Sequence, residues 1–102
     1  MELQQNNLNL TVKLSGEIDH HKANEIRTRI DEAIDKSPPK YLIFDLEKVT
    51  FMDSSGIGVI MGRYKKITAM GGAVYFKGVN NCIDKLVQMS GLLRIIPEIK
   101  QA

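Results

Sequence analysis

The sequence has too little cysteine for a disulfide-stabilised fold. Its only cysteine is Cys82, so no disulfide can form within the chain, which fits a reducing compartment. Residues 1–7 lack the basic and apolar regions of a signal peptide. No apolar run approaches the ~18 residues that a membrane span needs. The sequence therefore predicts a cytoplasmic protein without a membrane partner.

The sequence also lacks an excess of charge of either sign. Its 14 basic and 12 acidic side chains leave a net charge of only +2, which is too small to indicate a surface for nucleic acid. Hydrophobic residues make up 43% of the chain, which is ordinary for a globular protein and excludes disorder. A chain of 102 residues fits one domain with one core. We therefore expect a single domain over residues 1–102.

Catalytic motifs are missing as well. The chain has no Gly-x-x-x-x-Gly-Lys phosphate loop, no Gly-x-Gly-x-x-Gly turn and no Gly-x-Ser-x-Gly elbow. A phospho-aspartate receiver would need a pair of acids just after the first strand to hold Mg²⁺, and Ser15-Gly16-Glu17 fits that poorly. We expect no catalytic residue, no resident metal and no cofactor. The protein is thus predicted not to be an enzyme.

Hydrophobic periodicity predicts alternating strands and helices in the first half of the chain. Apolar side chains alternate over residues 8–14, as in a strand with one buried face, and residues 15–17 are expected to end it. Helical spacing follows over residues 23–34, with Asp19 as a candidate cap and two prolines after the end. Residues 41–44 are continuously apolar, which suits a central strand.

The second half continues the alternation. An extended segment over residues 49–52 leads to a polar turn and a helix over residues 57–67, which a glycine pair stops. Residues 73–76 are predicted to form a strand, residues 83–90 a helix and residues 92–96 a final extended segment. Strands and helices that alternate at this spacing predict an α/β fold with a largely parallel sheet.

The polar turn Asp53-Ser54-Ser55-Gly56 is the main candidate site. Asp or Ser at this position can simply cap the helix, but one cap needs only one residue. A second serine is then free to point outward at a helix N-terminus, which favours negative charge. Gly56 and Gly58 are costly in a helix interior, so their placement indicates that something approaches the backbone closely. A phosphate on a serine here would alter a docking surface.

The remaining reactive side chains have simpler interpretations. His20 and His21 are adjacent, and they indicate a metal site only if other ligands converge on them. Otherwise they belong to an exposed first turn or to a partner surface. Cys82 is interpreted as a small core residue rather than a reactive thiol. Four methionines are also expected in the core, namely Met52, Met61, Met70 and Met89.

Four segments together resemble one known family. Phe51–Ile60 (FMDSSGIGVI) resembles the signature turn of bacterial anti-sigma-factor antagonists, which carry the STAS fold. Residues 16–21, 62–65 and 89–92 match other parts of the family pattern, in the same order. The matches span residues 8–96. Within the family, the sequence most resembles the sporulation antagonists that free sigma factor F.

The resemblance implies a fold and a partner-switching mechanism. The fold is a small mixed β-sheet with packed α-helices. The unphosphorylated protein binds an anti-sigma factor that is also a serine protein kinase, and this frees the sigma factor to act in transcription. The kinase phosphorylates the first serine of the turn, Ser54 here, and the complex separates. A PP2C-type phosphatase restores the unphosphorylated form.

The free protein is expected to be a monomer. Family members continue into a C-terminal helix, whereas this chain ends at residues 100–102. The alternative function is a stand-alone STAS domain that binds a nucleotide or small ligand, or acts as a scaffold, without phosphorylation.

The resemblance also implies where the partner binds. The partner surface implied by the family comprises Asp19, His20, His21, Asp53, Ser54, Ser55, Gly56, Ile57 and Gly58.

Overall fold

A five-stranded mixed sheet forms the centre of the molecule. A computed structural model describes residues 1–99. The strands lie side by side in chain order. β1 runs antiparallel to β2, and all the other neighbours are parallel. The strands are β1 (Glu2–Asn6), β2 (Asn9–Ile18), β3 (Tyr41–Met52), β4 (Ala73–Lys77) and β5 (Glu98–Ile99).

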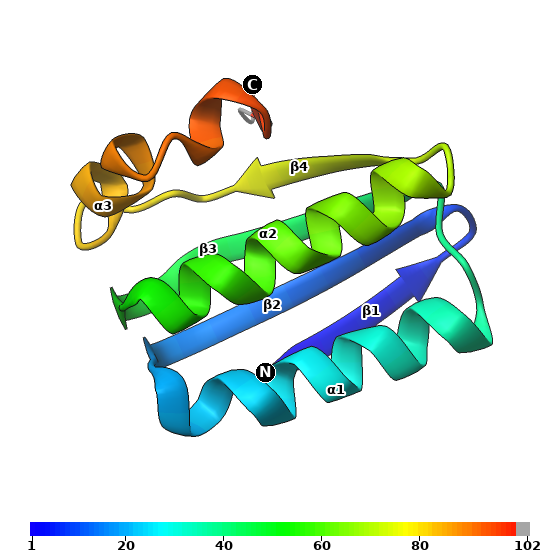
Figure 1. Cartoon of the computed structure of the whole chain (residues 1–102), viewed down its shortest axis with the longest axis horizontal. Helices are drawn as coiled ribbons and strands as arrows, with labels where there is room; N and C mark the ends of the chain where they lie inside the picture. Colours follow the sequence, from blue (N-terminus) through cyan, green and yellow to red (C-terminus); the bar gives the residue numbers. More distant parts are fainter. Residues whose placement is uncertain (100–102) are drawn as a thin grey trace.

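Two long helices cover one face of this sheet. Figure 1 shows α1 (His20–Lys36) and α2 (Ser54–Ala69) side by side in front of the strands. The shorter α3 (Asp84–Met89) and a 3₁₀ turn, η1 (Leu92–Arg94), follow the carboxyl end of β4. None of the helices within residues 1–99 combines the length and hydrophobicity that a bilayer-spanning segment requires.

The core lies between the sheet and the two long helices. Alternate side chains of each central strand are buried, as one covered face requires. The helices bury residues spaced three, four or seven apart. The main core residues are Leu10, Val12, Leu14, Leu42, Phe44, Leu46, Val74 and Phe76 from the sheet, and Ile26, Ile30, Ile34, Val59, Ile60 and Ile67 from the helices.

The strand β1 was not predicted from the sequence. Its segment is polar, and Leu3 is its one half-buried side chain, so no hydrophobic alternation marks it. β1 joins β2 through a two-residue turn in which Asn7 has a φ of 58°. Asn tolerates this left-handed conformation better than most residues. β1 is an edge strand, and its antiparallel direction makes the sheet mixed.

β2 and β3 are longer than their apolar runs. Residues 15–17 were expected to end the first predicted strand, but β2 continues to Ile18. Its register to β3 shifts twice near Ser15 and Gly16, and Gly16 has a φ of +71°. This irregularity explains why the segment looked like a strand end. The two predicted extended segments at residues 41–44 and 49–52 are one continuous strand.

One side chain in the loop after β4 supports the extended part of β3. β4 pairs with β3 only as far as Asp45. Beyond that point, Asn80 Nδ2 lies 3.0, 2.9 and 2.8 Å from the carbonyl oxygens of Leu46, Glu47 and Val49. Asn80 Oδ1 also accepts a hydrogen bond from the Cys82 backbone N–H at 2.8 Å. This amide replaces the missing strand neighbour.

The end of the chain differs from the prediction. Residues 92–96 were expected to be extended, but they form η1 and a turn, because Gly91 adopts a left-handed φ of 81° and Leu92 and Ile96 turn into the core. The last strand among the described residues is β5, a little later. The question of a C-terminal helix falls on residues 100–102, which lie outside the described residues.

Candidate functional site

Two helix N-termini meet at one edge of the sheet. β2 and β3 are parallel neighbours, and Ile18 pairs with Met52 at their carboxyl ends. The next residue in each case, Asp19 and Asp53, is the N-cap of a helix. The Asp53 backbone N–H donates to the Ile18 carbonyl at 3.3 Å. In α/β sheets, binding sites usually lie outside the carboxyl ends of the strands, so this edge is the candidate site.

Asp19 caps α1, as the sequence predicts. Its Oδ1 accepts hydrogen bonds from the backbone N–H groups of His21 and Lys22 at 3.0 and 3.2 Å. Partial burial favours the neutral acid, but those two hydrogen bonds and the charges of His21 and His20 outweigh it and lower the pKa of Asp19 below 3.8. The carboxylate is therefore ionised at neutral pH.

Asp53 caps α2 and leaves Ser54 free. The Asp53 carboxylate accepts from the backbone N–H groups of Ser55 and Gly56 at 2.8 and 3.3 Å. Ser54 is the first residue of α2 and is exposed. Within residues 1–99 its hydroxyl makes no hydrogen bond. The Asp53 carboxylate therefore caps the helix, and the Ser54 hydroxyl is left available to another molecule.

The two glycines of the turn have different roles. A methyl group at Gly56 would lie 2.5 Å from Met52 Cγ and 3.1 Å from the Ile18 carbonyl oxygen. Close approach at Gly56 is therefore made by the protein's own strands, and the residue is buried. At Gly58 nothing lies within 4 Å, and the residue is exposed. Only Gly58 leaves the backbone open to a partner.

The other predicted partner residues lie in the first turns of α1 and α2. His20 and His21 are exposed, with ring centroids 3.9 Å apart. Ile57 is half-buried against the core. No group of three or more potential metal ligands occurs among residues 1–99. Phe51, which was not predicted as a site residue, is 49% exposed just before the turn.

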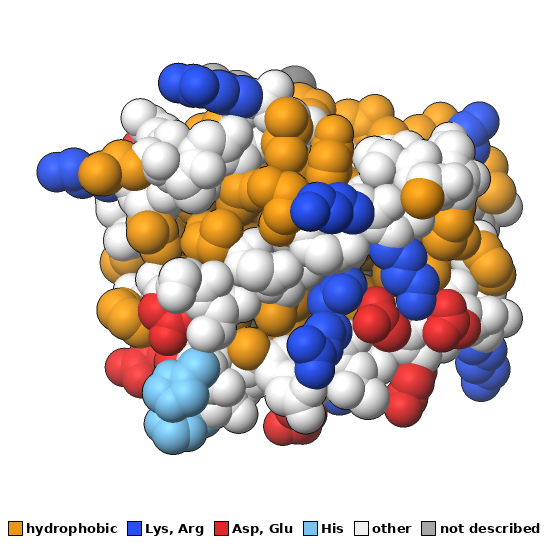
Figure 2. Space-filling view, viewed as in Figure 1, with side chains coloured by type: hydrophobic (Ala, Val, Ile, Leu, Met, Phe, Trp, Pro, Cys, Tyr) orange, Lys and Arg blue, Asp and Glu red, His pale blue; other side chains and the backbone are white. Residues whose placement is uncertain are grey.

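A groove of about 450 Å³ runs between α1 and α2 from this edge. Figure 2 shows Lys and Arg side chains gathered in the middle of this face, with the two histidines at one end. None of the groove residues is acidic. They are His20, Ala23, Asn24 and Arg27 from α1, and Ser55, Gly58, Val59 and Arg63 from α2.

Arg63 is the unexpected residue of this groove. It is only 9% exposed, and its Nε lies 3.0 Å from Asp31 Oδ1. Neither of those atoms has the geometry of a hydrogen bond, and Arg63 Nη1 has no partner within residues 1–99. Burial lowers the pKa of Arg63, the charge of Asp31 partly opposes this, and the charge of Arg27 lowers it further. In the sequence, Arg63 stands at helical spacing between the buried positions Ile60 and Ile67, and a cation at such a position was the signal that could have pointed to this residue.

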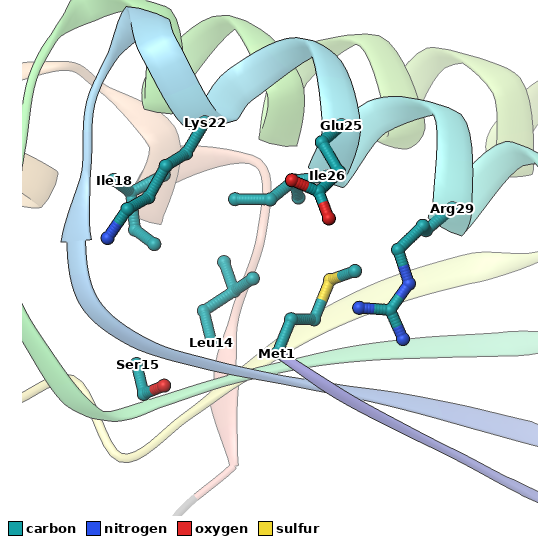
Figure 3. Close-up of a pocket in the computed structure, with 8 residues that line it drawn as sticks. All are labelled: Met1, Leu14, Ser15, Ile18, Lys22, Glu25, Ile26 and Arg29. Carbon is teal, nitrogen blue, oxygen red and sulfur yellow. The ribbon is translucent and has the colours of Figure 1, made fainter.

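A second hollow lies on the other side of α1. It has a volume of about 250 Å³ between α1 and the strands β1 and β2. Figure 3 shows Lys22 and Arg29 reaching from α1 over its two ends, with Leu14 between them. It contains none of the predicted site residues, so it is separate from the candidate site.

Three core predictions are wrong. Cys82 is exposed, because it lies in the polar loop before α3 while Ile83 takes the buried position. Met89 and Met70 are 75% and 47% exposed at the ends of their helices. Met52 is buried and Met61 packs against the core, as predicted.

The comparisons with known proteins agree with this geometry. The family model that describes the STAS domain matches residues 1–102. An anti-sigma F factor antagonist from Paenibacillus polymyxa is 46% identical over 88 residues, which cover 86% of this chain and 75% of the relative.

Two solved structures are of an anti-sigma factor antagonist, SpoIIAA. Its unphosphorylated form is 26% identical, has a TM-score of 0.78 and is matched over 99% of this chain and 88% of that one. Its phosphorylated form, from Bacillus, is 30% identical, has a TM-score of 0.77 and is matched over 98% and 91%. The chain therefore belongs to the STAS-domain family of anti-sigma-factor antagonists, and its single STAS fold confirms the predicted class.

Proposed function

We propose that this protein is a non-catalytic antagonist that works by partner switching. In its unphosphorylated form it binds an anti-sigma factor, which is also a serine protein kinase, and so frees a sigma factor such as sigma factor F in sporulation. Phosphorylation of Ser54 ends this binding, and a PP2C-type phosphatase restores it. The proposal rests on the curated relatives that are named as anti-sigma factor antagonists and on the geometry of Ser54.

The division of work between Asp53 and Ser54 carries the proposal. Capping by Asp53 satisfies the first N–H groups of α2, so modification of Ser54 removes nothing that the fold needs. The hydroxyl is exposed at the first helical position. A kinase can reach it without unfolding the turn. Ser55 is half-buried and lines the groove instead, which makes it the poorer acceptor.

Phosphorylation acts on the complex rather than on the fold. A phosphate adds about −1.5 to −2 charges at neutral pH. The N-terminus of α2 partly stabilises that charge, while the neighbouring Asp53 carboxylate repels it. In the complex the phosphate would be desolvated against a surface shaped for a neutral hydroxyl, which costs several kcal/mol. A swing from 1:99 to 99:1 in binding needs about 5.5 kcal/mol.

The partner surface includes both helix N-termini at this edge. Asp19, His20 and His21 lie beside the Ser54 turn because their strands are neighbours in register. Gly58 and Ile57 extend the surface along α2, and Gly56 supports it from below. We propose that Asp19 contacts a basic group of the anti-sigma factor in addition to its role as a cap.

The test is incubation of the protein with the anti-sigma kinase of the same organism and ATP, followed by intact mass and peptide mapping. We expect one phosphate on Ser54, no phosphate on Ser54→Ala and normal phosphorylation of Ser55→Ala. A phosphate found only on Ser55 would contradict the assignment of the site. An unmodified protein that also fails to bind the kinase would favour the ligand-binding or scaffold alternative.

A further inference from the structure

The groove between α1 and α2 has an uncompensated positive charge. Arg63 forms part of it and is 9% exposed. Its Nη1 has no hydrogen-bond partner among residues 1–99. Among residues 1–99 its ion-pair partner is Asp31, whose Oδ1 also lies 3.7 Å from Lys66 Nζ, so this carboxylate serves two cations.

A second guanidinium lies at the same groove. Arg27 is exposed on α1, and its Nη2 donates a hydrogen bond to Asn24 Oδ1, another groove residue. Arg27 forms no ion pair within the described part of the chain. It lies close enough to Arg63 for the two positive charges to repel each other. Within the described part of the chain, Arg27, Arg63 and Lys66 have only Asp31 and Asp35 as ion-pairing acids, so at least one positive charge is unmatched.

The groove is continuous with the proposed docking surface. His20, Ser55 and Gly58 belong to both. A partner that covers these residues also covers the groove and removes water from the guanidinium groups. Burying a cation without a counter-charge is strongly unfavourable. A partner can bind tightly there only if it supplies negative charge.

We infer that the groove binds a carboxylate side chain of the anti-sigma factor. This carboxylate forms an ion pair with Arg27 at the rim and is also attracted by the positive charge of Arg63 beneath it. The partner thus meets this surface with both signs of charge, an acid over the groove and a basic group at Asp19. This inference rests on the proposed function for the source of the carboxylate. The carboxylate site itself is argued from the charges that line the groove.

The chain offers a matched pair of variants for the test. Arg27→Met and Arg29→Met make the same change at two exposed positions of α1 that are two residues apart and lie on different sides of the helix. Arg29 lines the other hollow and not this groove. In calorimetric titration with the anti-sigma factor, Arg27→Met should weaken binding about tenfold or more, and Arg29→Met should stay within about twofold. Equal effects of the two variants, or no effect of Arg27→Met, would overturn the inference and leave the proposed function standing.

A probe that does not depend on the partner tests the groove alone. A tri-glutamate peptide added to ¹⁵N-labelled protein should shift the amide signals of Ser55 and Gly58 and the Nε–H signal of Arg63. Tri-glutamine at equal ionic strength should not, and Arg27→Met should abolish the shifts. Peptide shifts with no binding of the anti-sigma factor would overturn the partner as the source while the anion site stands. Equal shifts with both peptides would overturn the site.

Discussion

At the scale of single residues, the turn separates positions that support the fold from positions that face outward. Asp53 and Gly56 face the helix and the core, whereas Ser54 and Gly58 face solvent. The sequence shows only four small or polar residues close together. Their different roles follow from the contacts of α2 with the ends of β2 and β3.

The two glycines provide the sharpest comparison. Gly56→Ala would force a methyl group against Met52 and the Ile18 carbonyl, so we expect a loss of roughly 1–3 kcal/mol in the free energy of unfolding. Gly58→Ala has open space and should stabilise the protein by roughly 0.5–1 kcal/mol, while it weakens binding of the anti-sigma factor. Urea unfolding measures both values. Similar destabilisation by the two substitutions would contradict this assignment.

Asp19 can be tested as a cap and as a contact separately. Asp19→Asn should keep most of the cap, because Asn and Asp cap about equally well, so stability at neutral pH should change little. It removes the charge, so binding to the anti-sigma factor should weaken about tenfold or more if the pair is buried. Unchanged affinity in calorimetric titration would leave Asp19 with the capping role alone.

The pKa of Asp19 also predicts a pH dependence with a definite sign. Because this pKa is lowered in the folded state, the contribution of the carboxylate is complete above 3.8 and disappears as pH falls through the folded value. The stability difference between the parent and Asp19→Asn should therefore depend on pH only on the acid side. Urea midpoints measured across that range, with the carboxyl pKa determined by NMR, check this.

At the scale of elements, the helices could be predicted and the strand ends could not. Each long helix has a cap, a hydrophobic stripe and a stop within its own sequence, and both were found with nearly correct bounds. β1 has one half-buried side chain, so its place depends on backbone pairing with β2 that no local pattern encodes. The groove was missed for the same reason, because Arg27 and Arg63 come together only when α1 and α2 pack.

Asn80 shows how one loop residue can hold a strand. Its amide nitrogen faces three carbonyl oxygens of β3. Asn80→Asp would place a negative oxygen among these acceptors, and we expect a loss of roughly 1–3 kcal/mol. Asn81→Asp is the matched control, because Asn81 is exposed and surface changes usually stay within about 0.5 kcal/mol. Thermal unfolding of both variants decides, and equal melting temperatures would refute the role of Asn80.

At the scale of the whole molecule, the proposed switch is expected to leave the fold unchanged. SpoIIAA structures in the unphosphorylated and phosphorylated forms match this chain about equally well, with TM-scores of 0.78 and 0.77. The core lies beneath both long helices, and Ser54 lies outside it. We therefore expect a charge at Ser54 to change what the molecule binds and to leave the packing of the core unchanged.

Ser54→Asp tests this separation. It should unfold within about 0.5 kcal/mol of the parent, keep the same circular dichroism spectrum and bind the anti-sigma factor much more weakly. Ser55→Asp places the same charge one residue later, beside the groove, and is a useful comparison. If Ser54→Asp lost binding only because it had unfolded, the switch could not be purely interfacial.

The exposed Cys82 has a practical consequence for such measurements. It is the only thiol in the chain, and it lies in the loop that follows the carboxyl end of β4, a parallel neighbour of β3. A maleimide fluorophore would thus attach at one known position on the edge of the sheet that carries Ser54, without any engineered cysteine. Rotation of the dye would slow when a partner docks and recover when the kinase acts. One labelled sample could follow a full cycle of association, phosphorylation and release in real time.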